Sequence, residues 1–359
     1  MSKKMSTKKY SHLSLEYMAA AFFVVVAAVF PIYLTRDHYL NISQDKATFF
    51  LISVAVFTAA AIVILYLTTT RFQPKDYFIQ NEPKRPLSVA EWALIAFLLF
   101  ALLSTLFSPF ASHEEIDVWR AQAIGRYEGF WAFLCYGLTF FIIARYFKPK
   151  RIHLIIFAAS ASLISLYAIL QFLDMDFMMR SGIFTEVPDD LVTVLAPLTR
   201  IFRTTLGNIN IVSGYAALAA VLFAGLFAGE DTKWGGLYLA TSALSFSMIL
   251  ITRGDAGTVG LLAGMALPIP YWLANRKRLG KIFITLASWC AMFAIYNVYL
   301  SWLQGRVQEN PALLAFESDY NFITNFSPMN PLLIVGFAAV LAAIGLGLVL
   351  WLKKWPEKI

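Results

Sequence analysis

Long apolar runs recur along almost the whole chain, and they constrain its fold more than any other feature. A helix that crosses a bilayer needs about 20 mostly apolar residues, and ten stretches meet this requirement. They lie at approximately 15–35, 47–70, 88–108, 129–147, 152–173, 209–228, 234–252, 256–274, 281–302 and 330–352. Backbone polar groups must be paired within lipid, and the runs lack the period-two alternation of barrel strands. The sequence therefore predicts an all-α polytopic membrane protein.

The composition agrees with a lipid environment. Hydrophobic residues make up 59% of the 359 residues and charged residues 14%, whereas soluble domains carry about 25% charged residues. Cys135 and Cys290 both lie inside apolar runs, and we interpret them as small core residues without a disulfide. Pro268 and Pro270 are expected to kink the end of the eighth run.

Lysine and arginine alternate between loops, which predicts the orientation of the chain. With the N-terminus in the cytoplasm, 20 of the 29 basic residues fall in inner segments, and 15 of the 22 acidic residues fall outside. We therefore expect cytoplasmic tails at 1–14 and 353–359 around a transmembrane domain at 15–352. The net charge of +7 follows from this asymmetry and does not indicate a nucleic-acid partner.

The nine outer cations differ in kind from the inner ones, because eight of them are arginine. They are Arg36, Lys46, Arg120, Arg126, Arg180, Arg200, Arg203, Arg253 and Arg306. Guanidinium is a rigid fork that matches pairs of phosphate oxygens. The alternative is that arginine simply extends its charged end to the membrane interface.

Three longer outer loops, 109–128, 174–208 and 303–329, hold most of the polar motifs. Arg126, Arg203 and Arg253 all fall at outer helix ends, where they could converge on one interfacial anion. Gly207 and Asn208 suit a turn and a helix start whose amides also bind phosphate, although an ordinary N-cap explains them equally well. The spans contain almost no ionisable residue near the midplane, which argues against a proton-coupled carrier. Gln171 and Asn297 are interpreted as helix-packing groups.

Four motifs in order resemble the O-antigen ligase and O-antigen polymerase superfamily, particularly its Gram-positive members. They are Gly125-Arg126-Tyr127-Glu128-Gly129 with Ala144-Arg145-Tyr146-Phe147-Lys148, Tyr167-Ala168-Ile169-Leu170-Gln171, Arg200-Ile201-Phe202 through Gly207-Asn208-Ile209-Asn210, and Thr252-Arg253-Gly254. The resemblance covers roughly residues 90–275.

The resemblance implies a metal-independent glycan transferase without a cofactor, acting in cell-surface polysaccharide assembly at the outer face of the plasma membrane. Its substrate would be a polyprenyl-diphosphate-linked glycan, and membrane lipids would surround it. The diphosphate lies at the headgroup level, where arginines stabilise it as a leaving group. The residues that this assigns to substrate binding are Arg120, Arg126, Arg200, Arg203, Asn208, Asn210 and Arg253.

One departure from the family leaves the activity open. Members of the family usually carry a large late outer loop with a histidine proposed as the base, whereas the loop at 303–329 is short and has no histidine. The remaining candidate bases are His113, Glu317 and Asp319, each of which could instead be a solvated loop residue. The chain is therefore expected to be a ligase or polymerase, a non-catalytic or truncated relative that binds lipid-linked glycan, or a lipid-linked glycan transporter.

Overall fold

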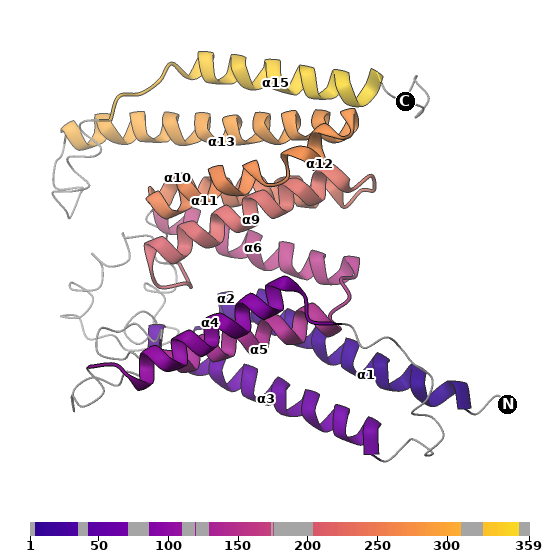
Figure 1. The fold of residues 1–359 in the computed structure, drawn as a ribbon. Coiled ribbons are helices and arrows are strands. Elements are labelled where there is room, and N and C mark those ends of the chain that lie inside the picture. Colours follow the sequence, from indigo (N-terminus) through magenta and orange to yellow (C-terminus); the bar gives the residue numbers. More distant parts are fainter. Residues whose placement is uncertain are drawn as a thin grey trace. The chain divides into compact units, whose positions relative to one another are not determined.

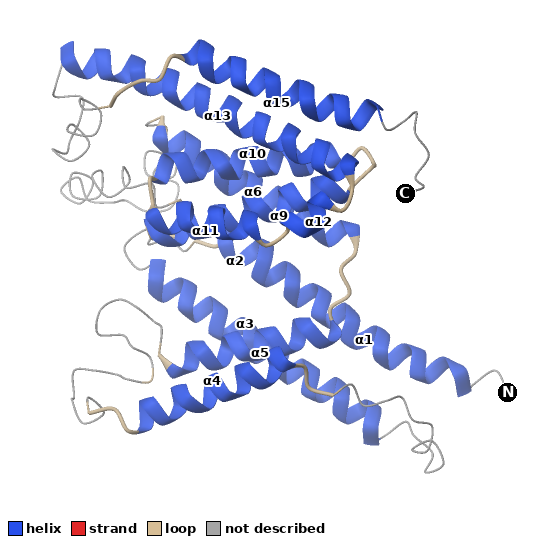
Figure 2. Ribbon diagram, turned by 45° about the horizontal axis from the view of Figure 1, so that its top comes forward, coloured by secondary structure: helices blue, strands red, loops and turns tan. Residues whose placement is uncertain are grey.

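The computed structural model of the protein describes residues 4–34, 42–70, 86–109, 119, 129–173, 175, 204–309 and 326–351. Within these ranges all regular elements are helices, and no strand occurs (Figures 1 and 2). The chain forms two compact units, Met1–Phe157 and Ala158–Ile359.

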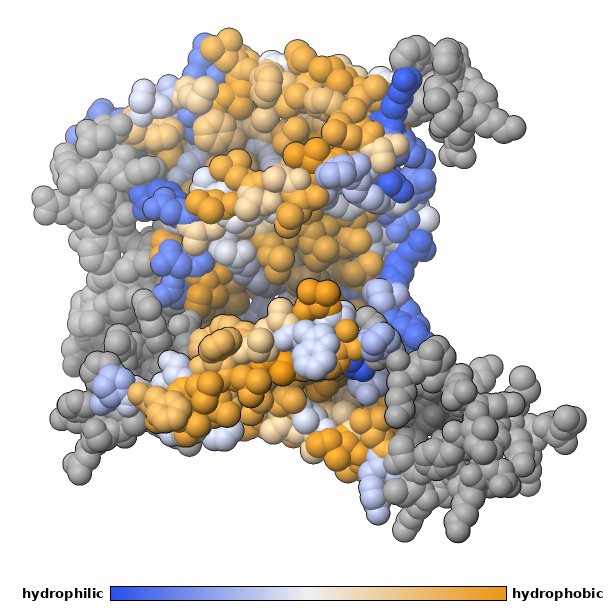
Figure 3. Space-filling model, viewed as in Figure 1, coloured by the Kyte–Doolittle hydropathy of each residue, from blue (hydrophilic) through white to orange (hydrophobic). Residues whose placement is uncertain are grey.

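Eight helical segments of the described chain are long and apolar enough to cross a bilayer. On the face drawn in Figure 3, hydrophobic residues cover much of the described surface, and hydrophilic residues gather towards helix ends. The last helix, α15 (Pro331–Trp351), exposes Leu332, Leu333 and Phe337. Large apolar side chains on an outer surface require an apolar solvent. The chain is therefore an all-α, multi-pass membrane protein, as its sequence predicts.

The first unit consists of four apolar helical segments and the start of a fifth. Its elements are α1 (Lys4–Val24), the π-helical turn η1 (Val25–Val29), α2 (Phe30–Ile32), α3 (Ile42–Thr70), α4 (Val89–Leu106), α5 (Phe130–Tyr146) and the beginning of α6 (Arg151–Phe172). Residues Leu15, Met18 and Phe22 of α1 follow a helical period and pack against Val54 of α3 and Ile142 of α5. This apolar seam holds the unit together.

Ion pairs gather at one end of the first unit. Glu16 lies 2.9 Å from Lys148 and 3.1 Å from Lys150, and Glu91 lies 2.8 Å from Arg145. All three cations belong to one segment around the end of α5 that the charge pattern assigns to the cytoplasm. The pairs therefore bring Glu16 of α1 and Glu91 of α4 to the end of α5.

Lys46, the single lysine among the nine predicted outer cations, has a structural partner. Its buried ammonium group donates to the carbonyl oxygens of Phe30 and, at 2.9 Å, Pro31. Carbonyls at a helix end lack partners within the helix, and a cation is favourable there. Lys46 thus provides hydrogen bonds to the carbonyl groups at the end of α2.

The second unit contains the rest of α6 and six further helices. They are α9 (Ile209–Gly229), α10 (Gly235–Thr252), α11 (Asp255–Ala266), α12 (Ile269–Leu273), α13 (Arg276–Glu309) and α15. The helices α13 and α15 run side by side (Figures 1 and 2), and their backbones come into close contact where Gly280 faces Gly345.

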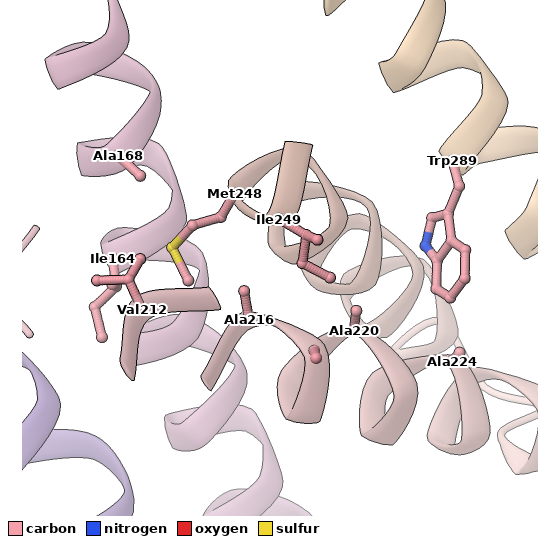
Figure 4. Close-up of a cluster of buried hydrophobic side chains, with 10 residues drawn as sticks. Ile164, Ala168, Val212, Ala216, Ala220, Ala224, Met248, Ile249 and Trp289 are labelled. Carbon is pink, nitrogen blue, oxygen red and sulfur yellow. The ribbon is translucent and has the colours of Figure 1, made fainter. Parts of the chain in front are cut away.

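Alanines along α9 form the centre of the second unit. Ala216, Ala220 and Ala224 recur every four residues and are buried beside Met248 of α10 and Trp289 of α13 (Figure 4). Small side chains at this spacing allow close helix packing within a membrane. A buried hydrogen-bond chain then runs from the Trp289 Nε1 to the Ser242 Oγ at 3.1 Å, and from there to the Ala220 carbonyl at 2.8 Å.

The eighth apolar run is broken, as the two prolines predict. The helix α11 ends at Ala266, and α12 begins at Ile269 with Pro270 in its first turn. Proline lacks the amide hydrogen that would continue the ladder. The twelve residues of α11 span about 18 Å, so α11 alone is shorter than the roughly 30 Å hydrocarbon layer.

Three helices extend beyond the bounds expected from the sequence, and one of them, α3, begins at Ile42, five residues before its apolar run. The helix α1 begins at Lys4, within the expected tail at 1–14, and α13 continues to Glu309, into the expected loop at 303–329. Buried Leu300 and Val307 lie seven residues apart and continue one packed face of α13. The apolar stretch therefore ends before the helix does.

Candidate functional site

Three of the predicted site residues, Asn208, Asn210 and Arg253, lie within the described chain, and all three belong to the second unit. The others lie outside the described residues: His113, Arg120, Arg126, Arg200, Arg203, Glu317 and Asp319. The site is therefore built from the start of α9, the end of α10 and the elements packed on them.

Asn208 is the N-cap of α9. Its backbone is extended, with φ −138° and ψ 134°, and its Oδ1 accepts a hydrogen bond from the Asn210 amide at 2.8 Å. This is the ordinary capping role that the sequence left open. The first amides of a helix lack partners within it and carry the positive end of its dipole. The start of α9 therefore presents amide groups beside two exposed asparagines.

A tight turn leads into this helix start. Thr204 has a φ of 47° and Gly207 a φ of 84°, both in the left-handed region. The Leu206 amide donates to the Thr204 Oγ1 at 3.2 Å. Glycine adopts such a backbone easily, whereas a β-branched threonine rarely does.

Gln171, near the end of α6, supports the turn. Its Oε1 accepts a hydrogen bond from the Thr204 amide at 2.9 Å. The sequence interprets Gln171 as a helix-packing group, and the structure shows that its buried side chain also binds loop backbone. Asn297 does the same elsewhere, donating to the Met329 carbonyl at 2.8 Å and accepting from the Met329 amide at 3.0 Å.

Arg253 ends α10 in a left-handed conformation, with φ 53° and ψ 23°. Its amide still reaches the Ile249 carbonyl at 3.2 Å, and its side chain is exposed. The preceding residue, Thr252, is buried and donates its hydroxyl to the same carbonyl at 3.0 Å. The chain therefore turns sharply at Arg253 and enters α11 at once.

The turn after Arg253 packs directly on the first turns of α9. A Cβ at Gly254 would lie 2.6 Å from the Ser213 Oγ, and a Cβ at Gly257 would lie 2.9 Å from the Ser213 carbonyl oxygen. The Ser213 hydroxyl in turn donates to the Asn210 carbonyl at 3.1 Å. No side chain beyond hydrogen fits at either glycine without a shift of α9 or α11. The structure thus brings Arg253 and the Asn208–Asn210 helix start to one end of the second unit.

Strained backbone gathers at this same end. Among the described residues, Thr204 and Arg253 are the non-glycine residues with positive φ. Such conformations cost roughly 1–3 kcal/mol each and cluster at functional sites. Both flank the start of α9, which marks this region as the candidate site on physical grounds.

Aromatic rings from the end of α6 and from α13 pack against one another. The ring centroid of Phe172 lies 5.7 Å from that of Tyr296 and 5.0 Å from that of Tyr299, whose ring lies 5.7 Å from Trp302. These rings were not expected from the sequence, although the spacing of three between the α13 aromatics is a visible signal.

The charge of the described site is nearly balanced. Asp255 is exposed at the first position of α11, two residues after Arg253. A carboxylate is favourable at a helix start, but it offsets the charge of one arginine. An anion with two or more charges would therefore need further cations.

A comparison of the chain with known proteins finds no relative. No family model, no curated protein and no solved structure matches it.

Proposed function

We propose that this chain is a plasma-membrane glycan ligase or polymerase that binds a polyprenyl-diphosphate-linked glycan at its outer face. The supporting observation is the strained Arg253 turn, held by Gly254 against the amide-bearing start of α9. A guanidinium fork beside the start of a helix is suited to phosphate oxygens. The site lies at a helix end, where the headgroup of a lipid-linked substrate would lie.

The sequence supplies the further cations that the charge balance requires. Arg200 and Arg203 precede the Thr204 turn in the chain, and Arg120 and Arg126 lie in an earlier predicted outer loop. In the proposal these arginines join Arg253 around the diphosphate. The membrane-spanning helices then keep the polyprenyl tail in lipid while the glycan stays outside.

The proposed reaction is a glycosyl transfer. An acceptor hydroxyl oxygen attacks the anomeric carbon, the bond from that carbon to the diphosphate oxygen breaks, and the diphosphate leaves with the bonding electrons. Arginines stabilise the charge that develops on the leaving group. The proton of the acceptor passes to a base, for which the sequence offers His113, Glu317 and Asp319.

A second candidate function, binding of lipid-linked glycan without catalysis, is favoured by one observation. The helix α13 continues to Glu309, and Gln304 donates to the Phe326 carbonyl at 3.0 Å. The segment between Glu309 and Phe326 is much shorter than the large late loop that is expected from the resemblance. It leaves little chain in which to place a base at that position.

The experiment compares purified protein variants in nanodiscs with a lipid-linked oligosaccharide. Arg253→Lys keeps the charge but removes the paired donors, so we expect weaker binding and slower transfer. Arg306→Lys is the matched control, because Arg306 is an exposed arginine at the end of α13 whose described contact is the Trp302 ring. Equal binding by both variants and the wild type would contradict the proposed diphosphate site.

The base is tested with His113→Ala, Glu317→Gln and Asp319→Asn. Loss of a general base typically lowers the rate by ~10²–10⁴-fold, so one variant should fall in that range. Binding without any turnover by the wild-type protein would instead support the non-catalytic function. Movement of the lipid across proteoliposomes would support a transporter.

A further inference from the structure

We infer that Gln171 is a positioning residue for the proposed diphosphate site, acting through the backbone of Thr204. This inference rests on the proposed function. It assigns to a transmembrane helix, α6, control over the binding geometry at the start of another helix, α9.

The hydrogen bond between Gln171 and Thr204 is buried and restrains the backbone. Gln171 is the penultimate residue of α6 and is 4% exposed, and Thr204 is fully buried. The 2.9 Å hydrogen bond joins residues 33 positions apart. A buried amide hydrogen without a partner is strongly unfavourable, and the Gln171 oxygen satisfies it here.

The amide in question belongs to a residue that needs external support. Thr204 holds a left-handed backbone, which a β-branched side chain disfavours. Strained residues persist only where their surroundings over-determine them. Gln171 provides one such restraint, and the bond from the Leu206 amide to the Thr204 hydroxyl provides another.

The restraint reaches the anion-binding groups in a few steps. The turn held at Thr204 ends at Asn208, which caps α9 through the Asn210 amide. One turn further, Ser213 packs against Gly254, the neighbour of Arg253. A shift of the Thr204 turn therefore moves the helix start relative to the guanidinium. Two charge-assisted contacts to one diphosphate depend on that relative position.

The test uses two variants of the same size class. Gln171→Met keeps the length of the side chain but has no oxygen acceptor, and Gln171→Glu keeps an oxygen at the same position. Ser162→Ala is the matched control, because it removes another α6 hydrogen bond, 2.9 Å to the Thr241 Oγ1. The full-length proteins are held in nanodiscs, and monodisperse elution with a cooperative thermal transition above the assay temperature establishes that each is folded.

Two readouts separate positioning from general damage. The first is the Kd for farnesyl diphosphate, used as a short polyprenyl diphosphate. The second is amide hydrogen exchange in peptides that cover residues 204–212. We expect Gln171→Met to raise the Kd roughly tenfold, the scale of one unpaired buried donor, and to speed exchange in that peptide. Gln171→Glu should restore slow exchange, and Ser162→Ala should leave both readouts unchanged.

Wild-type affinity in Gln171→Met, or weaker binding without faster exchange at 204–212, would overturn the inference. Arg253→Gln is measured in parallel to test the site itself. If Arg253→Gln binds farnesyl diphosphate as well as the wild type does, the proposed function fails. If Arg253→Gln weakens binding and Gln171→Met does not, only the positioning role fails.

Discussion

Gly345 lies directly against Gly280, backbone to backbone, where α15 crosses α13. A Cβ at position 345 would stand 2.6 Å from the Gly280 carbonyl oxygen, and a Cβ at position 280 would stand 2.8 Å from the Gly345 carbonyl oxygen. No real Cβ tolerates either distance, so the contact requires glycine on both helices. Helices in lipid associate through such close packing, because burial from water does not drive them together.

The first prediction concerns this crossing. Gly345→Ala should destabilise the protein by about 1–3 kcal/mol, the usual cost of forcing an extra group into a packed contact. Gly347→Ala is the control on the same helix, since a Cβ there meets nothing within 4 Å. Thermal unfolding in detergent measures both. An equal melting temperature for the two variants would contradict the packing argument.

The second prediction is a pH dependence at Asp231. This carboxylate lies 2.8 Å from both Lys277 and Lys281, and their hydrogen bonds hold its pKa at about 2, below the ordinary 3.8. Because the folded pKa is depressed, the stabilisation is complete above about pH 4 and disappears as the pH falls through about 2. The Asp231 side chain is 62% exposed, so the effect is under about 1 kcal/mol.

The measurement is thermal unfolding from pH 2 to pH 6. Asp231→Asn should be less stable than the wild type above pH 4 and should match it near pH 2. Lys281 still has the Glu230 carbonyl as an acceptor in this variant, so the fold persists. A constant difference across the whole range would show that Asp231 contributes through something other than its charge.

The third prediction uses the same contact to test topology. The pairing of Asp231 with Lys277 requires that the α9–α10 loop and the start of α13 share one side of the membrane. We expect that side to be cytoplasmic, because both tails and these loops carry the excess of lysine and arginine.

Single cysteines test it in a protein without Cys135 and Cys290. An impermeant thiol reagent applied to intact cells should leave Thr232→Cys and Lys277→Cys unlabelled and should label Asp255→Cys. The reverse pattern would invert the orientation. Labelling of only one of the first two positions would contradict the contact itself.

The fourth prediction concerns the first unit. Glu91 is 1% exposed, pairs with Arg145, and forms a capping box with Ser88 at the start of α4. Glu91→Ala keeps the bond from the residue 91 amide to the Ser88 hydroxyl but removes the acceptor for the Ser88 amide and the partner of Arg145, so it should lower the melting temperature clearly. Glu91→Gln keeps an acceptor for the Ser88 amide and should lower it less. Equal losses in thermal unfolding would mean that the charge alone matters.

The positions of the helices were predictable because lipid leaves the backbone few alternatives. Every apolar run became a helix or, at Pro268, a broken helix. The ends were less predictable. Apolar residues in the sequence indicate which part of a helix contacts lipid. The helix α13 continues beyond that part, through Gln304 to Glu309, because Val307 is still buried against the protein.

The candidate site was only partly predictable. Arg253 and Asn208 could be predicted from the sequence, because arginine indicates anion binding and an asparagine before an apolar run indicates a helix start. Gln171 stands in one of the motifs, but its role could not be predicted, because a buried amide looks the same in a sequence whether it bonds a neighbouring helix or a distant turn. The contact of Gly254 with Ser213 was equally hidden, since it depends on the path of two backbones.

A designer seeking a more heat-stable version of this protein would replace Arg253 with glycine, which adopts its left-handed backbone without strain. Substitutions that stabilise a protein often reduce its function, and here the stabilising change would remove the guanidinium itself. The residue at position 253 is thus poorly suited to its conformation, and under the proposed function its guanidinium serves to bind the ligand. Thermostability and ligand affinity should move in opposite directions there.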